Sequence, residues 1–144
     1  MSLEELYQDL ILDHFKNPRN KGPLKEPTAS CSLLNPLCGD EIEVNIKDQD
    51  NSLPEIKFSG KGCAISQASA SMMTELCAGR SREEVLRLCE TFRKLMRGEI
   101  EPEEAEELQD VLALEGVRKF APRVKCAVLA WEALEKCLKG QGEV

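Results

Sequence analysis

The sequence lacks several features that mark other classes of protein. Its apolar runs are only a few residues long, whereas a membrane-spanning helix needs about 20 residues. Positive charge is scarce, because 19 Lys and Arg stand against 26 Asp and Glu and leave a net charge of -7. We therefore expect no membrane partner, and no nucleic-acid partner, because non-specific binding to phosphates needs many cations.

Histidine is nearly absent as well. The single His14 falls on a predicted helix, where core packing is the simplest interpretation and contact with a partner enzyme is the alternative. Ser66, Ser69 and Ser71 have no His or Asp beside them in the sequence. We therefore expect these serines to be small packing residues rather than nucleophiles.

The N-terminal segment does not have the pattern of a secretory signal. Residues 1–15 are acidic and amphipathic, without a basic start or a continuous apolar stretch. We therefore expect a cytoplasmic protein. Its seven cysteines are an odd number in a reducing compartment, which argues against a disulfide framework.

The spacing of apolar residues predicts an α+β fold in a single domain, residues 1–144. Ile42, Val44 and Ile46 alternate with polar residues, which indicates a half-buried strand followed by a turn and a second strand. A third strand around residues 30–34 is expected, because a hairpin alone is only marginally stable. Helices are predicted over residues 2–16, 63–79, 81–98, 101–114 and 122–140. These elements predict a small antiparallel sheet of about three strands, with helices packed on one face and at its ends.

Helix geometry separates some of the cysteines. Cys77 follows Cys63 by fourteen residues on one predicted helix, which is about 21 Å at 1.5 Å per residue. Cys137 follows Cys126 by eleven residues, or about 16 Å. Neither pair can share a metal ion. Cys89 lies in an apolar stripe of its helix and is expected in the core, whereas spacing leaves the role of Cys31 open.

Cys38 and Asp40 frame a glycine in the stretch NPLCGD. Gly39 tolerates positive φ, so the chain can bend there and bring both side chains toward one centre. The alternative is an ordinary tight turn.

Cys63 and Cys126 lie near the starts of predicted helices. Cys63 opens a helix after Gly60 and Gly62, where the helix dipole favours a thiolate. Cys126 is expected in the first turn of the last helix, and Arg123 and Lys125 are expected to lower its pKa. Each cysteine alone could be a small buried residue. Three such cysteines with a nearby carboxylate point to a metal site instead.

Three motifs carry a family resemblance. The stretches NPLCGDEIEV, FSGKGCAISQASASMM and PRVKCAVLAWEAL follow LYQDLILDHFKNPRNKG in this order. Together they resemble the IscU/NifU N-terminal family of iron–sulfur cluster assembly proteins, over essentially the whole chain. The resemblance implies a SufE/NifU-like fold and four metal ligands, Cys38, Asp40, Cys63 and Cys126. Three cations then surround the ligands: Lys61, Arg123 and Lys125.

Two departures from IscU proteins favour the SufU branch of this family. IscU proteins carry a histidine immediately before the third cysteine, where this chain has Lys125. They also carry a Leu-Pro-Pro-Val-Lys segment for a cochaperone, which is absent here. An extra helical segment around residues 81–110 is a SufU trait.

The resemblance implies a zinc-dependent sulfur acceptor. Cys38 takes persulfide sulfur from a SufS-type cysteine desulfurase and passes it to a SufBCD-type scaffold, so the chain is sulfurtransferase-like rather than a stand-alone enzyme. The first alternative is an IscU-type scaffold, in which Cys38, Cys63 and Cys126 hold a labile [2Fe–2S] cluster for apo iron–sulfur proteins. The second alternative is a structural zinc domain that only mediates binding.

Overall fold

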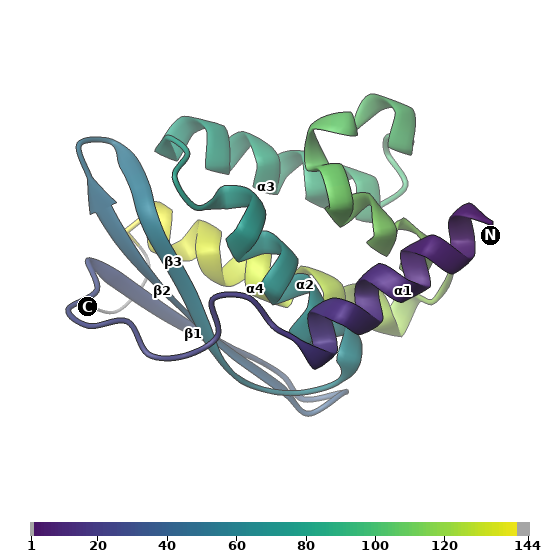
Figure 1. The fold of residues 1–144 in the computed structure, drawn as a ribbon, viewed down its shortest axis with the longest axis horizontal. Helices are drawn as coiled ribbons and strands as arrows, with labels where there is room; N and C mark the ends of the chain where they lie inside the picture. Colours follow the sequence, from purple (N-terminus) through teal and green to yellow (C-terminus); the bar gives the residue numbers. More distant parts are fainter. Residues whose placement is uncertain (1, 141–144) are drawn as a thin grey trace.

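A three-stranded antiparallel sheet forms one side of the molecule, and helices pack against it (Figure 1). The computed structural model describes residues 2–140. Its elements are α1 (Leu3–Lys16), β1 (Ala29–Asn35), β2 (Asp40–Gln49), β3 (Ser52–Lys61), α2 (Ala64–Cys77), α3 (Arg82–Met96), η1 (Pro102–Glu104), η2 (Glu106–Lys119) and α4 (Ala121–Leu138). The predicted α+β fold and its three strands are confirmed. Among the described residues, no helix combines the length and apolar character that crossing a membrane requires.

The sheet has the order β1-β2-β3, with both neighbouring pairs antiparallel. The alternating residues Ile42, Val44 and Ile46 of the central strand are all buried. Since α4 contacts β1 and β2 while α2 contacts β3, these two helices cover the face on which the apolar residues lie. The other face carries polar residues, as expected of an antiparallel sheet with one solvated side.

Helix α2 is the central helix, and its small residues explain how it fits there. It packs against α1, α4, β3 and η2, and it is buried on every side over most of its length. Ser69 donates to the Ala127 carbonyl at 2.6 Å and accepts from the Trp131 indole at 3.0 Å. Ser71 contacts the ring of the buried His14 at 2.8 Å. Ser69, Ser71 and His14 are thus buried as predicted, but the contact between Ser71 and His14 was not expected from the sequence.

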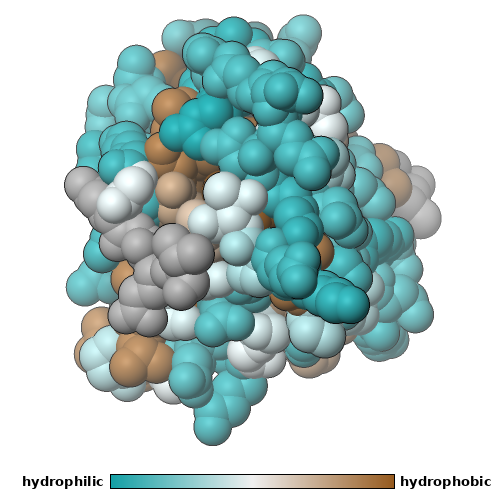
Figure 2. Space-filling view, turned by 90° about the vertical axis from the view of Figure 1, so that its left-hand side faces the viewer, coloured by the Kyte–Doolittle hydropathy of each residue, from teal (hydrophilic) through white to brown (hydrophobic). Residues whose placement is uncertain are grey.

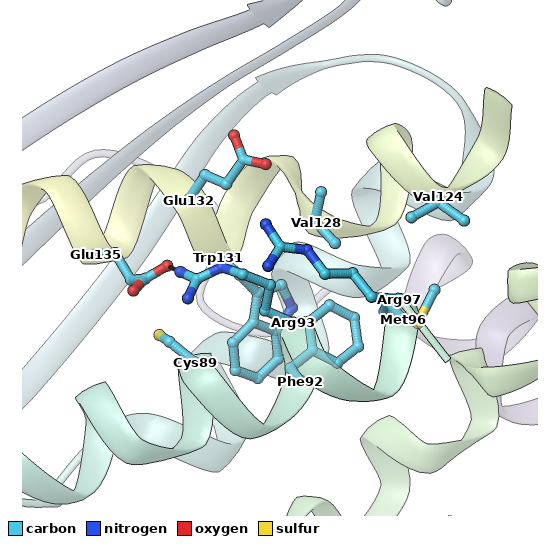
Figure 3. A pocket seen from close by; sticks show the side chains of 10 residues that line it. All are labelled: Cys89, Phe92, Arg93, Met96, Arg97, Val124, Val128, Trp131, Glu132 and Glu135. Atoms are coloured by element: carbon cyan, nitrogen blue, oxygen red, sulfur yellow. Dashed lines mark ion pairs between the residues drawn. The ribbon is translucent and has the colours of Figure 1, made fainter. Parts of the chain in front are cut away.

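Helices α3 and α4 pack side by side through aromatic and charged contacts. The rings of Phe92 and Trp131 stack with centroids 4.5 Å apart, and Arg93 forms an ion pair with Glu135 (Figure 3). A small cavity of about 90 Å³ lies between these side chains. Cys89 also lines this cavity and is buried, so its predicted place in the core is confirmed.

The acidic segment after α3 corrects one prediction. Residues 101–114 were expected to form a short α-helix, but the structure has two 3₁₀ segments, η1 and η2. Five of the six buried residues recur at intervals of three, which is the period of a 3₁₀-helix rather than 3.6; they are Ala105, Leu108, Val111, Leu114 and Val117, and the sixth is Ala113. Gln109 interrupts η2 with a φ of 52° and a ψ of -125°.

The surface agrees with the composition. On the face seen in Figure 2, hydrophilic residues dominate and hydrophobic residues form only small, separate patches. The large exposed apolar residues include Leu34, Leu37 and Phe120. Leu34 and Leu37 flank the turn that carries Cys38, and Phe120 immediately precedes α4.

Burial of His14 predicts a pH dependence of stability. Burial lowers the pKa of His14 below the ordinary value of 6.5, and the positive charge of Arg19 lowers it further. The neutral ring therefore stabilises the fold fully above about pH 6.5, and this stability is lost as the pH falls below that value. Between pH 7 and pH 5.5 we expect the melting temperature of the wild-type protein to fall. The melting temperature of His14→Gln should fall less over the same range. The two proteins share all other titrating groups, so parallel pH curves would contradict this role of His14.

Candidate metal centre

The turn between β1 and β2 holds two of the predicted ligands. Asn35 ends β1, and the Cys38 amide donates to the Asn35 carbonyl at 3.2 Å, which closes the turn. Gly39 has a φ of +69°, a value that glycine adopts without strain. Asp40 then begins β2 directly opposite Asn35. The bend therefore does what the sequence predicted and turns Cys38 and Asp40 toward the same region.

Helix α4 brings the third ligand to this turn. The sulfur atoms of Cys38 and Cys126 are 3.0 Å apart. The ligand atoms of Cys38, Asp40 and Cys126 all lie within 4.8 Å of one another. Cys126 is the sixth residue of α4, in its second turn, so the predicted place in the first turn was wrong by a few residues. The structure thus brings together three of the four predicted ligands.

Cys63 borders this compact group. It is the residue immediately before α2, and its backbone amide donates to Asp40 Oδ1 at 2.9 Å. Its thiol interacts with both Asp40 and Cys126. The Cys63 sulfur nevertheless lies outside the set of three ligand atoms that are mutually within 4.8 Å. Its side chain is also partly exposed, whereas Cys126 is fully buried.

Asp40 is a buried carboxylate that the protein keeps ionised. Its side chain is only 1 % exposed, and Oδ1 accepts from the Cys63 amide and from the Ser66 hydroxyl at 3.0 Å. Burial alone would raise the pKa of Asp40, but the Cys63 amide and the side chains of Cys126, Ser66 and Cys63 together lower it below its usual value. Asp40 therefore places a fixed negative charge beside the cysteines.

Gly62 makes room for this arrangement. A Cβ atom at position 62 would lie 2.3 Å from Asp40 Oδ1 and 2.6 Å from the Ser66 hydroxyl. The backbone there also has a φ of +156°. Glycine is therefore required where β3 passes the carboxylate on its way to α2.

The pKa of the Cys126 thiol is shifted in the direction opposite to the prediction. Burial raises its pKa, and hydrogen bonds with Cys38, Asp40 and Cys63 raise it further. The expected lowering by Arg123 and Lys125 is therefore wrong for the protein without a metal ion, because desolvation and the acidic neighbours outweigh the cations. Hydrogen bonding to Cys126 raises the pKa of Arg123, so this guanidinium does lie beside the cysteines.

The other two predicted cations lie at the edge of the site. Lys125 is exposed on α4, in the residue before Cys126. Lys61 is exposed at the end of β3 and stands opposite Glu41 in the sheet. Of the three predicted cations, Arg123 is thus the one that hydrogen-bonds to a cysteine of the cluster.

The remaining cysteines lie in the interior. Cys31, Cys77, Cys89 and Cys137 are all buried. Burial raises the pKa of Cys77 and that of Cys137 to about 12, and raises the pKa of Cys89 well above its usual value. Thiols of this kind stay protonated and unreactive at neutral pH.

The donor set fits a zinc ion. Zinc prefers four ligands in a tetrahedron and binds sulfur at about 2.3 Å, which places two sulfur ligands about 3.8 Å apart. Cys38 and Cys126 Sγ are 3.0 Å apart, so the two sulfurs already lie side by side and would have to separate slightly around the ion, and an ionised carboxylate stands beside them. A divalent cation would also supply the positive charge that a buried carboxylate and a buried thiolate need. The residues that could hold it are Cys38, Asp40, Cys63 and Cys126.

Two polar residues of the site were not found by sequence reasoning. Ser66 was interpreted as a packing residue, but its hydroxyl donates to Asp40 Oδ1. Ser66 follows Cys63 by three residues, which places the two on the same face of a helix. This spacing was the one feature of the sequence that could have assigned Ser66 to the site. Asn35 donates to both Asp40 Oδ2 and Cys126 Sγ, at 3.4 and 3.6 Å. Nothing in the sequence pairs Asn35 with Cys126, which is 91 residues away.

Comparisons with known proteins find relatives over nearly the whole chain. The chain is 44 % identical over 135 residues to the zinc-dependent sulfurtransferase SufU of Bacillus subtilis, covering 94 % of this chain and 90 % of that protein. It is 40 % identical over 137 residues to the iron–sulfur cluster assembly scaffold protein IscU of Streptococcus pyogenes, covering 95 % and 85 % of the two chains.

The fold is similar to that of a solved structure as well. A crystal structure of a putative iron–sulfur cluster assembly scaffold protein for the SUF system, from Fervidobacterium islandicum, superposes with a TM-score of 0.85. The two chains are 29 % identical, and the match covers 95 % of this chain and 99 % of that one. The family model for the NifU-like N terminal domain matches residues 6–140. The chain therefore belongs to the NifU-like N-terminal domain family of iron–sulfur cluster assembly proteins.

Proposed function

We propose that this protein is a zinc-dependent sulfur acceptor, which takes persulfide sulfur from a SufS-type cysteine desulfurase and delivers it to a SufBCD-type scaffold. The observation that carries the proposal is the cluster of Cys38, Asp40 and Cys126, in which Cys38 alone is partly exposed. The B. subtilis relative, a zinc-dependent sulfurtransferase, supports it. The protein works in the cytoplasm, where the thiols of the site stay reduced.

The four ligands divide into an anchor and an acceptor. Bound zinc would hold the cysteine sulfurs as thiolates at neutral pH. Asp40 and Cys126 are almost fully buried and form the anchor together with Cys63. Cys38 sits in a turn at the surface, where a partner's reactive cysteine can approach it.

The transfer itself needs no oxidant or reductant. The Cys38 thiolate attacks the outer sulfur of the desulfurase persulfide. A new S–S bond forms on Cys38 while the partner's S–S bond breaks, and the partner's cysteine leaves as a thiolate. The sulfane sulfur then moves from Cys38 to the next acceptor by the same exchange.

A second function is favoured by a different comparison. The S. pyogenes relative is an iron–sulfur cluster assembly scaffold, and the same cysteines could hold a [2Fe–2S] cluster. In that case Cys38, Cys63 and Cys126 would be cluster ligands, and apo iron–sulfur proteins would be the recipients. One carboxylate among the thiolates suits a cluster that has to leave.

Zinc content tests the ligand assignment. We expect about one zinc ion per chain in the wild-type protein, and loss of most of it in Cys126→Ser, because the thiolate ligand is removed. Cys77→Ala is the matched control, since it alters a buried cysteine outside the site. Elemental analysis of protein purified without added metal measures both. Zinc lost from Cys77→Ala and kept by Cys126→Ser would refute the assignment.

Chelation tests whether zinc is needed for the fold. The hydrophobic core includes none of the four proposed ligands, so the helical circular dichroism should remain when zinc is removed. The melting temperature should fall by about 5–10 °C, for free zinc near 100 times its Kd. Loss of the helical signal at room temperature would favour the structural zinc domain instead.

Two variants separate sulfur transfer from cluster assembly. Cys38→Ser removes the proposed nucleophile, so activation of the desulfurase should stop even where some zinc remains. Asp40→Ala keeps the nucleophile and removes one ligand, so we expect a colourless protein with less zinc and weaker activation. The visible spectrum and iron content of anaerobically purified Asp40→Ala decide between the functions. A stoichiometric [2Fe–2S] spectrum would make the scaffold the leading function.

A further inference from the structure

The side chain of Asn35 is aimed into the cysteine cluster. Asn35 is the last residue of β1 and is only 5 % exposed. Its Nδ2 lies 3.6 Å from Cys126 Sγ and 3.4 Å from Asp40 Oδ2. Because a carboxylate oxygen and a thiolate sulfur are acceptors, the amide nitrogen has to be the group that faces them.

The two neighbouring sulfurs therefore have different surroundings. Cys126 Sγ is buried and receives the Asn35 amide. Cys38 Sγ lies 3.0 Å away, and the Cys126 thiol is its one hydrogen-bond donor among residues 2–140. No nitrogen donor of the described chain is placed on Cys38 in the way that Asn35 is placed on Cys126.

Asn35 also belongs to the turn, but its side chain has no part in that role. The turn is closed by the backbone carbonyl of Asn35, which accepts from the Cys38 amide. Both side-chain contacts of Asn35 go to the site instead. A substitution that keeps the backbone in place should therefore remove the contacts to the site and leave the turn closed.

An N–H donor on a metal-bound thiolate draws electron density from the sulfur, which makes it a poorer nucleophile and holds it in place. We propose that Asn35 is a positioning residue that determines which cysteine leaves the metal: it retains Cys126 and leaves Cys38 as the exchangeable thiolate. This inference rests on the proposed function. It adds a reason, beyond exposure, why sulfur goes to one of two adjacent cysteines.

Asn35→Leu and Asn35→Ala remove the Asn35 donor, the first with a side chain of the same branched shape and the second without risk of overpacking. Asn45→Leu is the matched control. Asn45 is a buried asparagine of β2 that bonds to Ser30 and Glu43, and it pairs with Ser30 toward the opposite end of β1.

The first measurement is the absorption spectrum of the cobalt(II)-substituted protein. Loss of the N–H donor raises the energy of the sulfur lone pairs, so the thiolate-to-cobalt band should move to longer wavelength in both Asn35 variants. The band of Asn45→Leu should match that of the wild type. A merely structural role of Asn35 in the turn would not produce this shift, and unshifted bands in both variants would overturn the inference.

The second measurement maps iodoacetamide alkylation of the zinc-loaded proteins by mass spectrometry. In the wild type we expect Cys38 to react before Cys126. The ratio of Cys126 to Cys38 modification should rise about fivefold in the Asn35 variants, the factor that one ordinary hydrogen bond contributes. An unchanged ratio would overturn the inference even if a cobalt shift were seen.

Sulfur mapping keeps the two proposals apart. The wild-type protein is incubated with a cysteine desulfurase and cysteine, and the 32 Da addition is located by mass spectrometry. If no sulfur reaches Cys38, the proposed function fails, and so does the role of Asn35 in it. If sulfur reaches Cys38 in the wild type and both Asn35 variants behave as Asn45→Leu does, only the inference about Asn35 fails.

Discussion

The hydrogen bonds to the Asp40 carboxylate are the interaction on which the rest of the site depends. Asp40 begins β2, and its Oδ1 is held by the backbone of Cys63 and the hydroxyl of Ser66, where β3 passes into α2. This one oxygen atom therefore fixes the end of the sheet against the start of the central helix. A side chain at Gly62 would occupy the same space, which is why the chain needs glycine there.

The site is polar and buried, yet the hydrophobic core is built without it. The hydrophobic core is made of residues from the sheet and from the helices on one face of it, and it contains none of the proposed ligands. This separation lets the ligands be arranged for exchange rather than for packing. An ionised carboxylate and a thiol with a raised pKa are costly to bury together, and a bound divalent cation would offset that cost.

Much of the fold could be predicted because its signals are local. The alternation of Ile42, Val44 and Ile46 marked the central strand, and the helix predicted from residue 81 begins where Ser81 caps α3. The segment after residue 101 was misassigned, since proline and acidic residues are equally typical of an α-helix and of the 3₁₀ turns found there. The interval of three between most of the buried residues distinguishes a 3₁₀-helix from an α-helix here. Because burial is set by the tertiary structure, this interval could not be recognised in the sequence.

The site could likewise be predicted only where its residues are close in the sequence. Cys38 and Asp40 could be paired through the glycine between them, and Cys126 by resemblance to a family. Asn35 could not be paired with Cys126, because α4 brings the two together from 91 residues apart. The direction of the Cys126 pKa was wrong for a related reason: the neighbouring cations are visible in the sequence, but the burial is not.

X-ray absorption at the zinc edge tests the central claim most directly, because it reads the ligands without altering the chain. We expect three sulfur atoms at about 2.3 Å and one oxygen atom at about 2.0 Å from the metal. Four sulfur ligands and no oxygen would contradict Asp40 as a ligand. An imidazole signal would contradict the site altogether, since the single histidine, His14, is buried against Ser71 of α2.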